Sequence, residues 1–169
     1  MKKPTLILFI LNILAIPAHT ADLVSLNFKG NIKAASCNLS TPDDIDINLN
    51  NISMGVFYNT NSASNWNPFN IELKDCSSYI KQINITFTGT ADNADINSLY
   101  KNQGTATNIA IQLQSINDTV MLGNNKTLTI PTNGKSLVTI PLQTRAFSVL
   151  GNGTAGTLSA NITATITYL

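Results

Sequence analysis

The chain has 169 residues, of which 43% are hydrophobic and only 11% are charged, and its formal net charge is +1. Basic and acidic residues are not gathered into long runs of one sign, so the surface suits neither nucleic acid nor anionic lipid. The length is enough for one domain with a real core, but not comfortably for two.

The N-terminus has the layout of a secretory signal peptide. Two lysines precede an apolar stretch, residues 6–16, which is too short to span a bilayer, and small residues follow it. Cleavage after Ala18 or after Ala21 would each leave a large side chain three positions before the cut. We favour Ala21, so that residues 1–21 are the signal peptide and the mature chain begins at Asp22 with a net charge of −1.

From Val24 onward the first mature segment alternates, with apolar Val24, Leu26 and Phe28 separated by Ser25 and Asn27. This pattern predicts a strand with one apolar face. Gly30 follows and could separate the strand from the rest of the domain. Two interpretations are open: an ordinary first strand of the same domain, or an arm that pairs with another copy.

Cys37 and Cys76 are the two cysteines of the chain. In an exported protein they predict one disulfide, with a pair of free thiols as the alternative. Closing a loop of about 38 residues would stabilise the fold by roughly 4 kcal/mol. The predicted role is structural, not catalytic.

Alternation of apolar and polar residues continues along the chain, and no stretch has a convincing helical period. The strands that it predicts are centred on residues 45–49, 69–73, 83–87, 109–113, 128–130 and 138–142. Residues 50–66 and 90–104 are rich in Asn, Ser, Thr, Asp and Gly, which predicts loops. Asn133 and Gly134 predict a tight hairpin turn.

The last segment has the cleanest pattern: the even-numbered residues from Leu158 to Tyr168 are apolar and those between them are polar. It predicts one long strand. Short strands separated by turn signals are typical of an all-β Greek-key sandwich of the immunoglobulin type.

Three segments resemble the pilins of type 1 and related fimbriae. Residues 28–37 (FKGNIKAASC) are similar to the start of those pilins, and residues 100–109 (YKNQGTATNI) and 141–146 (PLQTRA) to the minor, tip-adaptor subunits. The pilin C-terminal motif has a penultimate aromatic and a glycine fourteen residues from the end, which here are Tyr168 and Gly156. The final Leu169 departs from the small or polar residue that is common there.

The resemblance implies an incomplete immunoglobulin-like sandwich that lacks its last strand and is completed by a donor strand. A periplasmic chaperone would lend a strand, and the arm of the next subunit would replace it at the outer-membrane usher. The domains expected on this basis are the signal peptide, a donor-strand extension over residues 22–29 and a pilin domain over residues 30–169.

The resemblance also implies which residues make the joint. Val24, Leu26 and Phe28 would be the donor face, each contributing roughly 1.5 to 3 kcal/mol on burial. The chaperone and the groove would meet the C-terminal residues Gly156, Ile162, Ala164, Ile166 and Tyr168.

Three other features of the sequence could indicate a functional site, but each is better explained by structure. Residues 151–156 spell GxGxxG, but a strand follows where a dinucleotide site needs a helix. Asp43, Asp44 and Asp46 lack the spacing and the bidentate glutamate of an EF-hand, so a solvated strand entrance is favoured over calcium. The lone histidine lies in the signal peptide and both cysteines are better used in a disulfide, which leaves nucleophilic catalysis without support.

We therefore expect a structural subunit of an adhesive fimbria, exported through the periplasm to the cell surface, with no enzymatic activity and no cofactor. Its partners would be the chaperone, the usher and neighbouring subunits. The alternative is a single-domain adhesin that binds host glycans, in which Trp66 and Tyr58 could stack on a sugar. The length argues against the two-domain adhesin plan.

Overall fold

The computed structural model describes residues 27–32 and 34–169. They fall into two units, Met1–Lys33 and Ala34–Leu169. The expected signal peptide, Val24 and Leu26 lie outside the described residues, and residues 27–32 are exposed and contain neither helix nor strand. Within the described ranges, no helix has the length and apolarity needed to cross a membrane.

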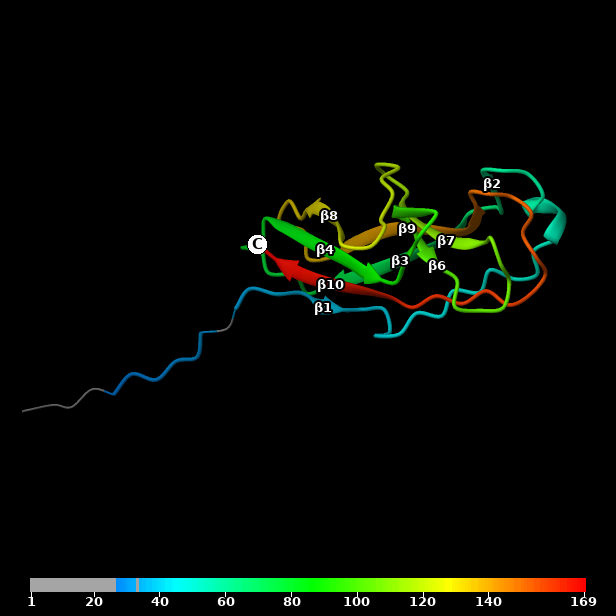
Figure 1. The fold of residues 1–169 in the computed structure, drawn as a ribbon. Helices are drawn as coiled ribbons and strands as arrows, with labels where there is room; N and C mark the ends of the chain where they lie inside the picture. Colours follow the sequence, from blue (N-terminus) through cyan, green and yellow to red (C-terminus); the bar gives the residue numbers. More distant parts are fainter. Residues whose placement is uncertain (1–26, 33) are drawn as a thin grey trace, which may run out of the picture. The chain divides into compact units, whose positions relative to one another are not determined.

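Two antiparallel sheets make up the second unit (Figure 1). The larger sheet has the order β1-β3-β9-β7-β6-β5, with β2 also paired to β9, and the smaller has the order β10-β4-β8. The chain crosses repeatedly between the sheets, as expected for an immunoglobulin-like sandwich, and the predicted all-β class is confirmed. The strands are β1 (Asn38–Leu39), β2 (Ser62–Ala63), β3 (Asn67–Lys74), β4 (Gln82–Gly89), β5 (Ala91–Asp92), β6 (Asp95–Lys101), β7 (Ala110–Ser115), β8 (Lys126–Pro131), β9 (Val138–Ser148) and β10 (Ile162–Tyr168), with one 3-10 helix, η1 (Met54–Phe57).

The inward faces of the two sheets form the main core. Ile83 and Ile85 of β4 and Ile140 and Leu142 of β9 are fully buried, at every second position of their strands. This is the period of two that the sequence shows. Ile162, Ala164, Ile166 and Tyr168 of β10 pack against the same core but stay half-buried.

The loop predicted over residues 90–104 is wrong, because this polar segment contains β5 and β6. Leu99 and Tyr100 of β6 are consecutive and both buried. Apolar and polar residues therefore do not alternate along this strand, and the pattern does not predict it. The Tyr100 hydroxyl donates to the Leu122 carbonyl at 2.9 Å. Burial raises the pKa of Tyr100 to about 12.

The predicted hairpin at Asn133 and Gly134 is half right. Both residues have positive φ, 51° and 70°, and the Lys135 amide donates to the Thr132 carbonyl at 3.0 Å, so the tight turn is present. However, β8 pairs with β4 and β9 pairs with β3 and β7. The turn therefore carries the chain from one sheet to the other and closes no hairpin.

Two predicted strands also differ. Residues 45–49 are not a strand, and the last strand begins at Ile162, not at Leu158. In both places the apolar alternation is real, but the ladder that would define a strand is missing. A strand needs a hydrogen-bonding neighbour as well as an apolar face.

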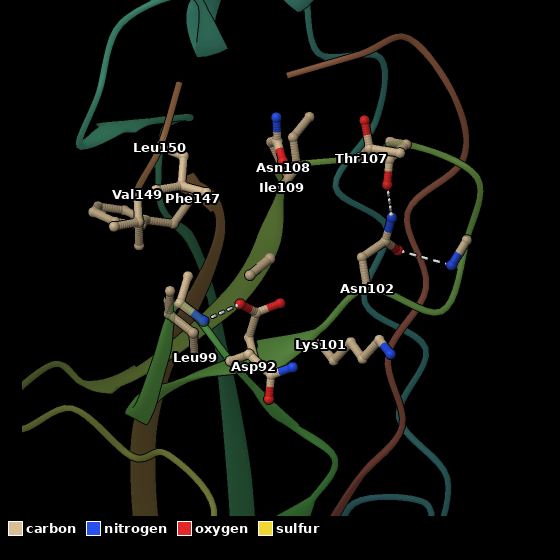
Figure 2. Close-up of a pocket in the computed structure, with 15 residues that line it drawn as sticks. Asp92, Leu99, Lys101, Asn102, Thr107, Asn108, Ile109, Phe147, Val149 and Leu150 are labelled. Atoms are coloured by element: carbon tan, nitrogen blue, oxygen red, sulfur yellow. Dashed lines mark hydrogen bonds between the residues drawn. The ribbon is translucent and has the colours of Figure 1, made fainter. Parts of the chain in front are cut away.

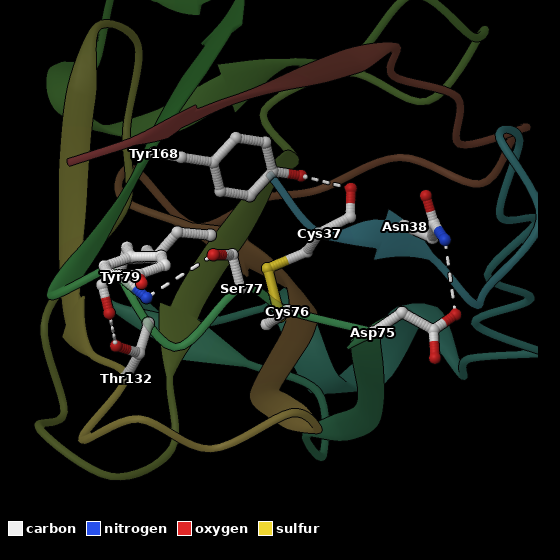
Figure 3. The surroundings of a disulfide bond; sticks show 9 residues. Cys37, Asn38, Asp75, Cys76, Ser77, Tyr79, Thr132 and Tyr168 are labelled. Atoms are coloured by element: carbon white, nitrogen blue, oxygen red, sulfur yellow. Dashed lines mark hydrogen bonds between the residues drawn. A yellow bond between two sulfur atoms is a disulfide. The ribbon is translucent and has the colours of Figure 1, made fainter. Parts of the chain in front are cut away.

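The predicted disulfide is confirmed: Cys37 and Cys76 are bonded, just before β1 and just after β3 (Figure 3). Asn38 donates to the Asp75 carboxylate at 3.2 Å beside it. The Tyr168 hydroxyl donates to the Cys37 carbonyl at 3.4 Å, so the end of β10 is tied to the same corner of the domain.

Candidate docking groove

A groove of about 1250 Å³ lies beside β10. Residues 41–52 bound one side, and residues 154–164 with Ile166 bound the other. Figure 1 shows the cyan segment that follows β1 running along the same side of the domain as the red segment that ends in β10. Apolar side chains from both sheets and from the η1 region form the floor: Phe57, Phe69, Ile71, Phe87, Ile109, Ile111 and Leu113.

The floor is the open edge of the core. Ile71, Phe87 and Leu113 are 2 to 6% exposed, whereas Ile162, Ala164 and Ile166 on the wall are only half-buried. The wall residues alternate, so one face of β10 contributes to the groove and the other carries threonines. An occupant with the same alternation would complete the burial of these side chains.

Both walls have free backbone edges. Among residues 27–32 and 34–169, β10 pairs only with β4, over its whole length from Ile162 opposite Gly89 to Tyr168 opposite Ile83. Residues 41–52 make no backbone-to-backbone hydrogen bond with any part of the chain from residue 34 to residue 169. Side chains engage two backbone groups of this wall: the Asn50 amide donates to Asn48 Oδ1 at 2.8 Å, and Asn67 Nδ2 donates to the Asn48 carbonyl at 3.1 Å. Two edges without a strand partner, on either side of an apolar floor, form a site for an extended strand.

Four of the five C-terminal residues singled out from the sequence line the groove: Gly156, Ile162, Ala164 and Ile166. Tyr168 lies beyond the lining, where its hydroxyl meets Cys37. The expected donor residue Phe28 is 90% exposed and belongs to the other unit.

The opposite wall was missed by the sequence reasoning. Ile45, Ile47, Leu49 and Ile52 line the groove, although the first three were expected in a paired strand. Their alternation was the available signal, and only the lack of a partner distinguishes them from a core strand.

The rim of the groove is acidic. Asp43, Asp44 and Asp46 line it and are exposed, and the lining contains neither Lys nor Arg. In the described ranges no group of three or more His, Cys, Asp or Glu side chains could hold a metal ion.

A second cavity, of about 540 Å³, is lined by residues of the segment from β5 to the start of β7 and by residues at the end of β9 (Figure 2). Phe147, Val149 and Leu150 form an apolar side, and Lys101 and Asp92 lie across from them. It shares Ala106 and Ile109 with the groove, but its charged side chains include Lys101, whereas the groove lining has neither Lys nor Arg.

Trp66 and Tyr58 do not form one site with this cavity. The Arg145 guanidinium carbon lies 4.1 Å from the centre of the Trp66 ring and 5.3 Å from that of Phe147. Partial burial lowers the pKa of Arg145, and its Nε donates to the Gln112 side chain at 2.7 Å. One face of Trp66 is therefore covered by a protein side chain, and Tyr58 is 74% exposed.

Comparison with known proteins agrees with this architecture. The family model "Fimbrial protein" matches residues 26–169. Protein FimG of Escherichia coli strain K12 is 32% identical over 99% of this chain and 97% of its own. The S-fimbrial adhesin protein SfaS of Escherichia coli O6:K15:H31 (strain 536 / UPEC) is 33% identical over 99% of both chains.

Among solved structures, the P pilus rod subunit PapA superimposes with a TM-score of 0.64 at 19% identity, covering 86% of this chain and 99% of its own. That likeness supports the fold. The family match and the two relatives together show that the chain belongs to the fimbrial protein family, whose members are structural subunits that associate into pili on the cell surface and are not enzymes.

Proposed function

We propose that the groove receives an extended arm from a neighbouring fimbrial subunit, and that this chain is a minor tip or adaptor pilin assembled by donor-strand exchange. Residues 22–29 would be its own arm for the next subunit, with Val24, Leu26 and Phe28 facing that subunit's groove. The similarity of residues 100–109 to minor, tip-adaptor subunits supports a position at or near the tip of the fibre.

The unpaired walls of the groove are the observation that carries the proposal. An arm lying between β10 and residues 41–52 would satisfy backbone groups on both walls and cover Ile47, Ile162 and Ile166. Burying three large side chains of the arm would add roughly 1.5 to 3 kcal/mol for each. Its own face must be apolar at every second residue, which is the pattern of residues 24–28.

An empty groove of this kind invites aggregation, since it exposes apolar side chains and free strand edges. The proposed assembly route therefore includes a periplasmic chaperone that covers the groove and an outer-membrane usher at which the arm replaces it. Residues 1–21 would direct export, after which the disulfide forms and residues 30–169 fold as the pilin domain.

The chaperone contact has a direct test. Changing Ile166→Ser together with Tyr168→Ser removes two apolar side chains from β10, so the periplasmic yield and co-purification with the chaperone should both fall. Undiminished co-purification would show that the chaperone binds elsewhere.

The groove itself is tested by adding an arm to the C-terminus. A copy of residues 22–29 would follow Leu169 through a short Gly/Ser linker, so that it can run antiparallel to β10. We expect the free energy of unfolding to rise by about 4.5 to 9 kcal/mol, measured by urea denaturation. The matched control carries serine in place of the three apolar arm residues; equal stability of the two extended chains would contradict the proposal.

A second candidate function is glycan binding, favoured by the 540 Å³ cavity and by the adhesin name of the relative SfaS. Its size suits a small ligand. Phe147 offers an apolar ring face, and Lys101 and Asp92 offer polar groups. Phe147→Ala and Lys101→Ala should then abolish adhesion to glycan-coated surfaces while pilus assembly continues; adhesion that is lost only together with assembly would favour the purely structural role.

A further inference from the structure

The wall at the Gly156 end of the groove is held in a different way from β10. The ladder between β10 and β4 begins only at Ile162. Residues 154–160 continue the same wall, but in the part of the chain that the structure describes their hydrogen bonds go to residues 102–107, which we name the clamp loop. This end of the wall depends on a loop, not on a sheet.

Backbone bonds set the spacing between the two segments. The Gln103 amide donates to the Ser159 carbonyl at 2.7 Å, and the Ala106 amide donates to the Thr157 carbonyl at 3.1 Å. Thr105 adds side-chain bonds, because its Oγ1 accepts from the Thr157 amide at 2.9 Å while its own amide donates to Thr157 Oγ1 at 3.0 Å.

Asn102 is the centre of this contact. Its Oδ1 accepts from the Gly104 amide at 2.9 Å and from the Ser159 amide at 2.8 Å. Its Nδ2 donates to the Ala106 carbonyl at 2.8 Å and to the Thr157 carbonyl at 3.1 Å; Figure 2 shows its bonds within the clamp loop. One amide side chain therefore fills its two donor and two acceptor positions, half within the loop and half on the wall.

Two glycines allow the close approach. A Cβ on Gly156 would overlap the backbone of Thr105 and Ala106, and a Cβ on Gly104 would overlap the Thr157 carbonyl. Gly156, which the sequence reasoning assigned to chaperone contact, thus also permits the wall to lie against the clamp loop.

The clamped end has its own small core. Phe57, Ala106, Ile109 and Ala146 form a buried cluster, and Leu49, Ile52 and Leu158 pack against it. Ala106 belongs both to the clamp loop and to the floor of the groove. A cluster of this size stabilises the wall little by packing alone. The hydrogen bonds to the clamp loop therefore determine the position of residues 154–160.

We propose that Asn102 is a positioning residue for arm docking: it fixes residues 157–159 so that the Gly156 end of the groove forms a pocket for one terminal apolar side chain of the arm. This inference rests on the proposed function. The partner is the extended, alternately apolar arm of a fimbrial subunit, and the clamp determines how many of its side chains find a pocket.

The test uses the full exported subunit, purified in complex with its chaperone, and a fluorescent peptide of residues 22–31 as the probe. Asn102→Asp keeps the size of the side chain and both acceptor bonds but turns the second oxygen toward two carbonyls. Peptide uptake should slow about tenfold, as expected from the loss of two hydrogen bonds. Asn117→Asp, in an exposed loop away from the groove, is the matched control and should leave uptake unchanged.

Peptides with Val24→Ala, Leu26→Ala or Phe28→Ala separate positioning from general destabilisation. In the Asn102→Asp subunit the Phe28 replacement should have no further effect, because an arm that runs antiparallel to β10 places Phe28 at the Gly156 end, where the pocket is already lost. The Leu26 replacement should slow uptake as much as in the wild type, since coupling is confined to neighbours.

Equal slowing of all peptides, or no slowing, would overturn the role of Asn102 while leaving the proposed function intact. If the wild-type subunit takes up no peptide, the proposed function itself fails. Should Asn102→Asp not fold, Thr105→Val removes the bonds of Thr105 Oγ1 to the Thr157 amide and, at 3.3 Å, to Thr157 Oγ1 at an exposed position, and should give the same pattern at about threefold.

Discussion

β9 and residues 41–52 have similar alternation but different surroundings. β9 pairs with β3 on one side and with β7 on the other, and its inward residues Ile140 and Leu142 are fully buried. Residues 41–52 pair with neither sheet, and Ile47 and Leu49 remain half-buried. The difference teaches that alternation specifies which face is apolar but not where the hydrogen-bonding partner lies, and we propose that the partner of residues 41–52 is the arm of another subunit.

The disulfide is where the paired and unpaired regions meet, since Cys37 precedes the open wall and Cys76 follows β3. Replacing both cysteines with serine should cost about 4 kcal/mol of unfolding free energy, with the open wall released first. Urea denaturation measures the cost. A loss below about 1 kcal/mol would show that contacts other than the disulfide hold the wall.

On the paired side, Ile140→Ala should cost about 3 kcal/mol, because it opens a cavity in a fully buried position. The cost should be the same with and without the C-terminal arm extension, since β9 is complete in both. If the cost of Ile140→Ala differs between the plain and the extended chain, β9 is not complete without the arm, which would contradict the distinction between the two regions.

On the open side, Ile47→Ser should have the reverse dependence. Half-exposed in the empty groove, Ile47 should contribute less than about 1 kcal/mol there, and about 2 kcal/mol once an arm covers it. Thermal unfolding of the four combinations of substitution and extension gives both values. Equal costs in the plain and extended chains would mean that the arm does not reach this wall.

The smallest effect concerns Tyr100, which lies on the paired side in β6. Because its pKa rises from 10.0 to about 12 on folding, its contribution is complete below pH 10 and is lost as the pH rises toward 12. Tyr100→Phe should cost about 1 kcal/mol at neutral pH through the lost hydrogen bond to Leu122, yet flatten the alkaline decline. If the free energy of unfolding of Tyr100→Phe falls between pH 10 and 12 as much as that of the wild type, the loss of stability is caused by other groups.

Much of this architecture could be predicted from local pattern. The all-β class, the disulfide, the turn at Asn133 and the apolar parity of residues 162–168 all follow from side-chain chemistry and spacing. Which sheet each strand joins could not be predicted, because pairing depends on contacts that are distant in sequence; the Asn133 turn therefore looked like a hairpin.

The site was only half predictable for the same reason. The β10 wall carries a family motif and was identified, whereas Ile45, Ile47 and Leu49 look like any core strand. Residues 95–101 were assigned to a loop because their polar composition hid a strand that is buried at Leu99 and Tyr100. Two of the four bonds of Asn102 reach Thr157 and Ser159, which lie 55 and 57 residues away in the sequence, and no local pattern shows them.

Hydrogen exchange of the backbone amides tests the central claim most directly. The plain chain and the chain with the C-terminal arm would be compared, with the serine-substituted arm as the control. We expect the amides of residues 41–52 to exchange freely in the plain and control chains and to become protected at least about a hundredfold with the apolar arm, while β9 is protected in all three. Unchanged exchange in residues 41–52 would contradict the account that this wall awaits a strand from another subunit.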